Sequence, residues 1–171
     1  MKRESAQKPD KNSRAYLEGQ VRYARNMVLI ILLMTLINLV FLLLEYDRYF
    51  LFSASVPYYG VALARIFELD MTLPLVLAAV IMAGYLICWL LAKKKSGAIT
   101  AALVFFCLDT LALLGIAFGV MESPLVNLLD LVFHVIGIIA LAQGVAAGVK
   151  LKNLPPEQVP EAPSADGIRY L

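Results

Sequence analysis

Four long apolar runs constrain this chain more than any other feature of its sequence. They cover residues 27–44, 73–92, 98–120 and 125–149. A helix that crosses a hydrocarbon core about 30 Å thick needs roughly 20 residues, and each run approaches or exceeds that length. Because a backbone within lipid must satisfy its own hydrogen bonds, we expect an all-α membrane protein with four transmembrane helices. The short link before the last run predicts a helical hairpin and, with it, an antiparallel bundle.

The composition agrees with a membrane protein and excludes several soluble classes. Of the 171 residues, 61% are hydrophobic and only 16% are charged. A soluble domain is about half apolar and about a quarter charged, so this chain has more apolar surface than one small globule buries. A soluble enzyme, a disordered chain and a disulfide-rich secreted domain are therefore excluded. The cysteines Cys88 and Cys107 lie inside apolar runs and lack the spacing of a redox or metal motif.

The basic residues are unevenly divided among the connecting segments, and this division predicts the orientation. Of the 15 Lys and Arg residues, 13 lie before the first run, at 93–95 or after the last run, and only Arg48 and Arg65 lie on the other side. Cytoplasmic segments are enriched in Lys and Arg, so both termini are expected in the cytoplasm of a bacterium, with the spans in its plasma membrane. Residues 1–26 then form a basic tail that could include an interfacial helix, and residues 150–171 a disordered, proline-rich tail.

The segment between the first two spans is unusually rich in aromatic residues. Ser53 or Ser55 could cap a short helix with Pro57 in its first turn, and we predict that this helix lies at the outer interface of the membrane. Two interpretations of the aromatic residues remain open, namely a belt that anchors the outer leaflet and a surface that binds a partner. The residues expected on this external surface are Tyr49, Phe52, Pro57, Tyr58 and Tyr59. Those expected on the membrane surface from the helix are Val61, Ala64, Ile66 and Phe67.

Polar side chains within the spans indicate which helix faces avoid lipid. A charge at mid-bilayer costs roughly 3 kcal/mol, so it is expected to face the protein interior. In the last two spans, buried-face positions recur at alternating spacings of three and four residues, as on one side of a packed helix. The series in the last span is Asn127, Asp130, His134, Gly137, Leu141, Gly144 and Gly148. The series in the preceding span is Ala102, Phe105, Asp109, Ala112, Ile116 and Gly119.

These series predict one group of polar residues inside the bundle, together with glycines at helix contacts. Helical rise places Asp109 and His134 at similar depths in the membrane. We define the polar cluster as Asn38, Asp109, Asp130 and His134, with Thr35 and Tyr85 as further candidates. Glycines allow close approach of helices in a membrane. The helix-packing positions are Gly115, Gly119, Gly137, Gly144 and Gly148.

Three interpretations of the polar cluster remain open. In the first, its hydrogen bonds are structural and fix the register of the helices. In the second, the carboxylates and the histidine conduct protons or cations, since histidine titrates near physiological pH. In the third, Asp130 and His134 bind a divalent metal with Asp109, although a single D-x-x-x-H spacing is a weak motif. The chain has neither H-E-x-x-H nor G-x-S-x-G, and we expect no enzyme activity, no cofactor and no resident metal.

Three stretches of the sequence resemble a family of membrane proteins. They are Y-A-R-N at 23–26, T-L-I-N at 35–38 and Y-F-L-F-S-A-S-V-P-Y-Y-G at 49–60. In these stretches the chain is similar to uncharacterised small four-helix integral membrane proteins of Gram-positive bacteria, over about its first third and beyond that only in topology. The resemblance implies that Asn38 and residues 53–59 belong to one unit, and it implies no particular activity.

Two functions are compatible with these observations. We expect a multi-pass plasma-membrane protein that acts without catalysis as an accessory or interaction component. The alternative is a small proton- or cation-coupled transporter built on Asp109, Asp130 and His134. The expected partners are the lipid bilayer and either a second copy of the chain or another membrane protein, and not nucleic acid.

Overall fold

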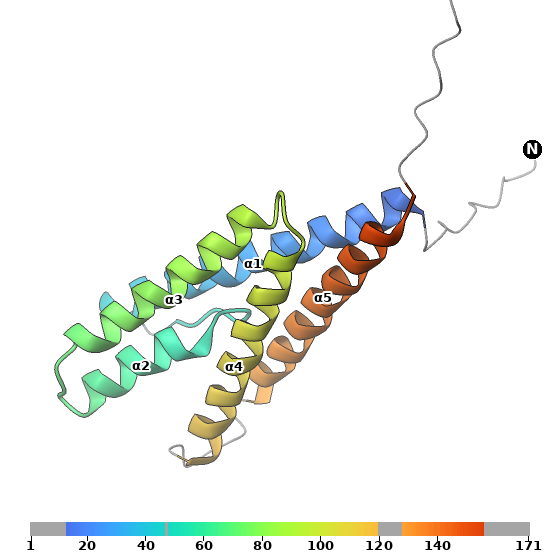
Figure 1. The fold of residues 1–171 in the computed structure, drawn as a ribbon. Helices are drawn as coiled ribbons and strands as arrows, with labels where there is room; N and C mark the ends of the chain where they lie inside the picture. The colour runs from blue at the N-terminus through green and yellow to red at the C-terminus, as the bar shows by residue number, and fades with distance from the viewer. Residues whose placement is uncertain (1–12, 47, 120–127, 156–171) are drawn as a thin grey trace, which may run out of the picture.

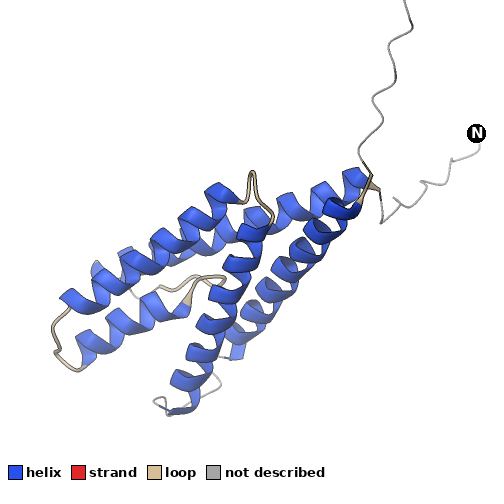
Figure 2. Ribbon diagram, viewed as in Figure 1, coloured by secondary structure: helices blue, strands red, loops and turns tan. Residues whose placement is uncertain are grey.

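The computed structural model describes residues 13–46, 48–119 and 128–155. In these residues all regular secondary structure is helical (Figure 2). All described helices other than α2 are long and apolar enough to cross a membrane. The fold is therefore all-α and compatible with a membrane protein. Its helices are α1 (Arg14–Leu43), α2 (Ser55–Ile66), α3 (Thr72–Leu91), α4 (Gly97–Gly119) and α5 (Leu128–Asn153).

The first long helix begins well before the first predicted span. The apolar run at 27–44 is the second part of α1, which starts at Arg14 after an N-cap at Ser13. The Ser13 side chain accepts a hydrogen bond from the backbone N–H of Tyr16, which satisfies one free donor of the helix start. Residues 14–26 continue into the span without a break, and Leu17 and Ala24 in this part are buried. The structure therefore has no separate interfacial helix within residues 14–26.

The other predicted spans lie close to the observed helices. The span predicted at 73–92 corresponds to α3, and the span predicted at 98–120 corresponds to α4, each within one residue where described. α5 continues to Asn153, four residues past the predicted end at 149. Residues 120–127, the N-terminal tail through residue 12 and the proline-rich tail from residue 156 lie outside the described residues.

α1 and α5 lie side by side and form the most extensive helix pair of the fold (Figure 1). Gly144 allows this approach, because a Cβ atom at Gly144 would collide with the Cβ atom of Ala24. A Cβ atom at Gly148 would lie 2.7 Å from the Cβ atom of Ser96, next to the start of α4. Both distances are too short for a side chain, so glycine is required at these two positions for α5 to pack as it does.

The two glycines of α4 that were predicted at helix contacts do not lie at such contacts. Gly115 and Gly119 are exposed, and a Cβ atom at either position would meet nothing within 4 Å. Gly137 of α5, in contrast, is buried, and its Cβ atom would lie 2.6 Å from Cε1 of Phe106. Of the predicted packing glycines, those of α5 thus lie at helix contacts, whereas Gly115 and Gly119 of α4 do not.

The buried face of α4 is rotated from the predicted series. Phe105 and Gly119 belong to that series, but Phe105 is 46% exposed and Gly119 is also exposed. Phe106 is fully buried instead, because its ring stacks on the imidazole of His134 with 4.8 Å between centroids and 6° between planes. The buried residues of α4 are Ile99, Ala102, Phe106, Asp109, Thr110, Leu113 and Ala117.

After α1 the chain turns back into the bundle. We call residues 48–54 the returning segment, and its last two residues, Ser53 and Ala54, are fully buried. Phe52 has a φ angle of 65°, which is unusual for a large side chain, and its ring packs on Phe133 of α5 at a centroid distance of 4.3 Å. The start of α2 is consequently held deep among the long helices.

α2 then runs alongside α3, and only its first turn lies beside α4 (Figure 1). Val61 and Ala64 were expected on the outer membrane surface, but both are buried. The reason is that this face of α2 packs against the other helices. Ile66 and Phe67, at the far end of the helix, are 71% and 61% exposed. The most exposed apolar side chains of this segment therefore lie at the end of α2.

Candidate functional site

Polar side chains from α1, α4 and α5 meet around the returning segment and the buried start of α2. The members of the polar cluster are all at most 4% exposed. Their hydrogen bonds join them to further side chains and to the backbone of residues 50–56. We call the combined set the polar network, and it consists of Thr35, Asn38, Tyr49, Ser53, Ser55, Asp109, Asp130 and His134.

Asp109 of α4 caps the N-terminus of α2. The backbone N–H of Ser55 donates to Oδ2 of Asp109 at 2.7 Å, and that of Val56 donates to Oδ1 at 2.8 Å. The N-cap residue of α2, Ala54, has no side-chain acceptor of its own. A carboxylate at this place also interacts favourably with the positive end of the helix dipole. Asp109 thus performs the capping predicted for Ser53 or Ser55.

The remaining backbone donors of this helix start are also accounted for. The N–H of Ala54 donates to Oγ1 of Thr35 at 2.7 Å, and the same hydroxyl donates to the carbonyl of Ile31. Pro57, in the first turn, has no N–H to satisfy. Since an unpaired backbone N–H away from water is costly, this pairing is what permits a helix to begin inside the bundle.

His134 of α5 connects the capping carboxylate to the rest of the network. Its Nδ1 atom lies 2.9 Å from the backbone oxygen of Asp130, which only accepts, so Nδ1 carries a proton. Its Nε2 atom lies 3.1 Å from Oδ2 of Asp109 and 3.2 Å from Oγ of Ser55. A contact between Nε2 and a carboxylate oxygen at this distance needs a proton on one of the two atoms. Asp109 and His134 therefore share a proton in the interior of the bundle.

Asn38 of α1 holds the returning segment through its amide group. Its Oδ1 atom accepts from the N–H of Phe50 at 2.7 Å, and its Nδ2 atom donates to the carbonyl of Phe50 at 2.7 Å. The same Nδ2 atom donates to Oγ of Ser53 at 2.9 Å. One side chain thus pairs both backbone groups of Phe50, as a neighbouring strand would.

Tyr49 extends the network to Asp130 of α5. Its hydroxyl donates to Oδ2 of Asp130 at 2.9 Å and lies 2.9 Å from Oγ of Ser53. The second carboxylate oxygen of Asp130, Oδ1, is buried without a hydrogen-bond partner among the described residues and lies 3.8 Å from Nδ1 of His134. The network therefore runs from Asn38 through Ser53 and Tyr49 to Asp130.

The structure brings all four residues of the predicted polar cluster into this one network. Of the two further candidates, Thr35 belongs to it, whereas the Tyr85 hydroxyl has no hydrogen-bond partner in the described structure. Ser53 and Ser55 were predicted as possible helix caps and not as members of the polar cluster, and the backbone N–H groups of α2 were not predicted as its partners. The signal for them in the sequence is weak, namely three small residues in succession at 53–55, two positions before Pro57.

The residues expected on an external loop surface largely face the interior. Pro57 is fully buried, Tyr49 binds Asp130, and Phe52 packs on Phe133. Tyr58 and Tyr59 are half-buried, and their rings pack edge to face with 5.3 Å between centroids. The aromatic residues of this segment thus contribute to holding it in place, because the segment folds back instead of lying over the bundle.

Two further properties of the described residues concern metal ligands and cysteines. Among these residues, no group of three or more His, Cys, Asp or Glu side chains is arranged to hold a metal ion. Cys88 and Cys107 are both free. The hydrogen bonds of the polar network are centred on one carboxylate–histidine pair, Asp109 and His134.

No protein-family model, no curated protein and no solved structure matches this chain. Inferences about function therefore depend on the four apolar helices and on the geometry of the polar network.

Proposed function

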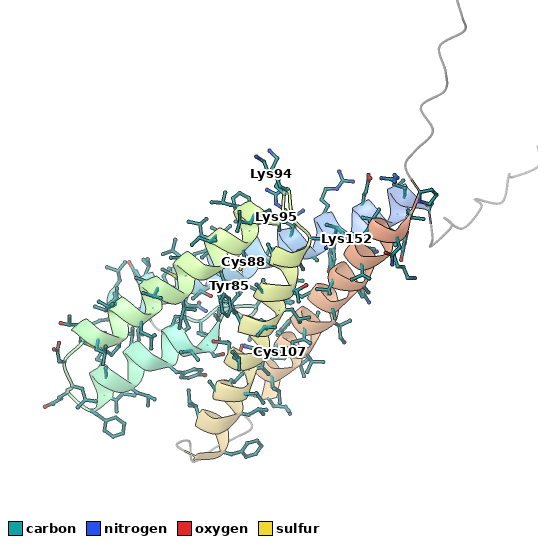
Figure 3. The ribbon with its side chains drawn as sticks, viewed as in Figure 1. Tyr85, Cys88, Lys94, Lys95, Cys107 and Lys152 are labelled. Atoms are coloured by element: carbon teal, nitrogen blue, oxygen red, sulfur yellow. The ribbon has the colours of Figure 1, made fainter. Side chains whose placement is uncertain are left out.

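We propose that this chain is a multi-pass plasma-membrane protein of a Gram-positive bacterium that acts without catalysis, as an accessory or interaction component. In this proposal α1, α3, α4 and α5 cross the bilayer as an antiparallel bundle with both termini in the cytoplasm. α2 then lies within the outer half of the bundle, and only its far end reaches the outer interface. The excess of basic residues supports this orientation, and Lys94, Lys95 and Lys152 all lie toward one end of the molecule (Figure 3).

The observation that carries this proposal is that the side chains of the polar network form their hydrogen bonds with other groups of the same chain. Asp109 caps α2, Asn38 pairs with the backbone of Phe50, and Tyr49 joins Asp130 to Ser53. A catalytic group must be available to a substrate, whereas these groups already hold one segment among the helices. The arrangement therefore supports a scaffold in which α2 is fixed in one position.

The far end of α2 is the part best suited to meet a partner. Ile66, Phe67 and Leu69 are 71%, 61% and 61% exposed. Next to them, Arg65 forms an ion pair with Glu45, which joins this end of α2 to the end of α1. An exposed apolar patch with polar residues at its rim is typical of a surface that contacts another protein or the membrane interface.

A photo-crosslinking amino acid at position 67 tests the interaction role. The matched control carries the same amino acid at Leu111 of α4, which is 63% exposed on a long apolar helix. The proposal expects a discrete adduct between this protein and a second copy or one membrane protein from position 67, and lipid adducts alone from position 111. Lipid adducts alone from both positions would overturn the interaction role.

The orientation is tested separately by cysteine labelling in intact cells. A membrane-impermeant maleimide is expected to label Glu68→Cys directly and Lys94→Cys only after the membrane is permeabilised. The reverse result would overturn the proposed orientation. Labelling of both positions without permeabilisation would show that they do not lie on opposite sides.

A second candidate function is a small proton- or cation-coupled transporter in which Asp109 and His134 take part in transport. The observation in its favour is the proton shared by Asp109 and His134, at the start of a helix that begins inside the bundle. The test is proton flux into liposomes that contain the purified protein and a pH-sensitive dye. Flux that is lost in Asp109→Asn, with the variant still folded, would favour transport over the scaffold. Absence of flux with the unchanged protein would exclude proton transport under the conditions used.

A further inference from the structure

A cavity lies between α3 and α4, beside the polar network. Its volume is about 310 Å³, and its lining includes Val80, Gly84, Tyr85, Phe105 and Asp109. Val80 and Phe105 are 62% and 46% exposed, so the cavity can be reached from the apolar outer face of these helices. A volume of this size is at the lower end of the range for small-molecule sites.

Tyr85 lines this cavity and carries the hydroxyl group on which the following inference depends. The residue is only 1% exposed, and its hydroxyl has no hydrogen-bond partner among the described residues. Figure 3 shows its side chain directed from α3 toward α4, and its ring meets that of Phe105 edge to face at 6.3 Å. Burying a hydroxyl without a hydrogen-bond partner costs free energy. A bound molecule that accepts a hydrogen bond from this hydroxyl would remove that cost.

The charge at the inner end of the cavity is already neutralised. The carboxylate of Asp109 accepts from two backbone N–H groups of α2 and contacts Nε2 of His134. A charged ligand would therefore find no free counter-charge and would lose its hydration on entering. The chemistry favours a neutral ligand that is apolar apart from one hydrogen-bond acceptor.

The wall of the cavity is formed in part by a glycine. At Gly84 a Cβ atom would lie 3.5 Å from Cε2 of Phe105, so a small side chain would fit there but a large one would fill the space. Gly84 precedes Tyr85 directly in α3, and both residues line the cavity. This arrangement suits a flat or slender apolar body.

We propose that this cavity binds a neutral, largely apolar carbonyl compound that enters from the lipid phase, with its carbonyl oxygen accepting the hydrogen bond of Tyr85. The inference rests on the proposed membrane location, because the open side of the cavity must face lipid. It does not depend on whether the chain acts as an interaction component or as a transporter.

Benzophenone is a suitable probe, because it is neutral, carries one carbonyl and forms covalent adducts when irradiated. The full chain in phospholipid vesicles is irradiated at increasing benzophenone concentrations, and the adducts are mapped by mass spectrometry. We expect saturable labelling within residues 80–85 and 105–108. Diphenylmethane has the same two rings without the carbonyl, and we expect it to compete about fivefold to tenfold more weakly, the value of one neutral hydrogen bond.

Two variants and one control test the assigned contacts. Tyr85→Phe keeps the ring, and we expect it to weaken benzophenone binding about fivefold to tenfold and to abolish the difference between the two compounds. Gly84→Leu fills the cavity and should abolish saturable labelling. Ala83→Leu places the same side chain at the adjacent exposed position and should leave labelling unchanged.

The outcomes separate this inference from the proposed function. Labelling that rises linearly with concentration and spreads over the apolar helices overturns the inference, as does equal competition by the two compounds. Unchanged labelling of Gly84→Leu overturns it as well. If cysteine labelling contradicts the proposed orientation while saturable benzophenone labelling persists, the orientation is wrong and the binding site remains supported.

Discussion

The Nε2 atom of His134 lies 3.1 Å from Oδ2 of Asp109, although these residues are 25 positions apart and belong to different helices. The same carboxylate caps α2 through the N–H groups of Ser55 and Val56. One pair of side chains thus connects α5, α4 and α2. A change to either residue should therefore affect the packing of all three helices.

The first prediction concerns the coupling between Asp109 and His134. We expect Asp109→Asn to destabilise the protein by about 3 kcal/mol, because the amide of Asn has one acceptor where the carboxylate has two. His134→Gln should cost about 2 kcal/mol, and the double variant should cost less than the sum by at least about 1 kcal/mol. The measurement is unfolding in mixed detergent micelles, followed by the fluorescence of the single tryptophan, Trp89. Additive effects of the two changes would contradict the direct contact.

The second prediction concerns the anchoring of the returning segment. Asn38→Leu removes every partner of the Phe50 backbone that the structure shows, and we expect a loss of about 2–4 kcal/mol. The freed segment should also become a substrate for chymotrypsin, which cleaves after aromatic residues. Asn26→Leu, at an exposed position of the same helix, is the control and should remain resistant. Equal rates of cleavage in the two variants would mean that Asn38 does not hold the segment.

The third prediction concerns the glycines of α5 and α4. Gly144→Ala should separate α5 from α1, since the added methyl group would collide with Ala24, and the expected cost is about 1–3 kcal/mol. Gly115→Ala is the matched change in α4, where the methyl group meets nothing. It should be neutral or should stabilise the helix by up to about 1 kcal/mol. Thermal unfolding of the two purified variants distinguishes them, and a reversed order would contradict the observed packing.

The fourth prediction concerns Arg25 and Trp89. The Nε atom of Arg25 donates to the backbone oxygen of Trp89 at 3.2 Å, and its guanidinium carbon lies 4.8 Å from the centroid of the Trp89 ring. Arg25→Gln should cost about 1–2 kcal/mol and shift the emission of Trp89. Arg22→Gln removes the same charge from an exposed position. It should change neither quantity, so similar effects of both variants would indicate a general effect of charge.

Much of the architecture follows from local properties of the sequence. The apolar runs at 73–92 and 98–120 correspond closely to α3 and α4, because length and hydrophobicity are read from neighbouring residues alone. The spacing of Asp130, His134, Gly137 and Gly144 likewise indicated one face of α5, and all four residues are buried. For α1 the apolar run underestimated the helix, because Ser13 and the following polar residues start it thirteen positions earlier.

Only some residues of the polar network could be predicted from the sequence. Asn38, Asp109, Asp130 and His134 could be named, since a polar side chain in an apolar run must avoid lipid. Their partners could not be named, because Ser55 meets Asp109 from 54 positions away and Tyr49 meets Asp130 from 81 positions away. Helical periodicity gives the face of a helix and the depth of a residue, but not the path of the loop that returns to it.

The sequence by itself determined that the chain forms long apolar helices and that a few polar side chains must lie inside them, because both follow from the energetics of a backbone and a charge in lipid. Only the tertiary structure decided that residues 48–54 fold back among the helices and that Asp109 caps α2. It also decided that α4 turns Phe106, and not Phe105, toward His134. These features depend on contacts between distant segments, where shape and hydrogen-bond geometry select one arrangement from several with similar hydrophobic patterns.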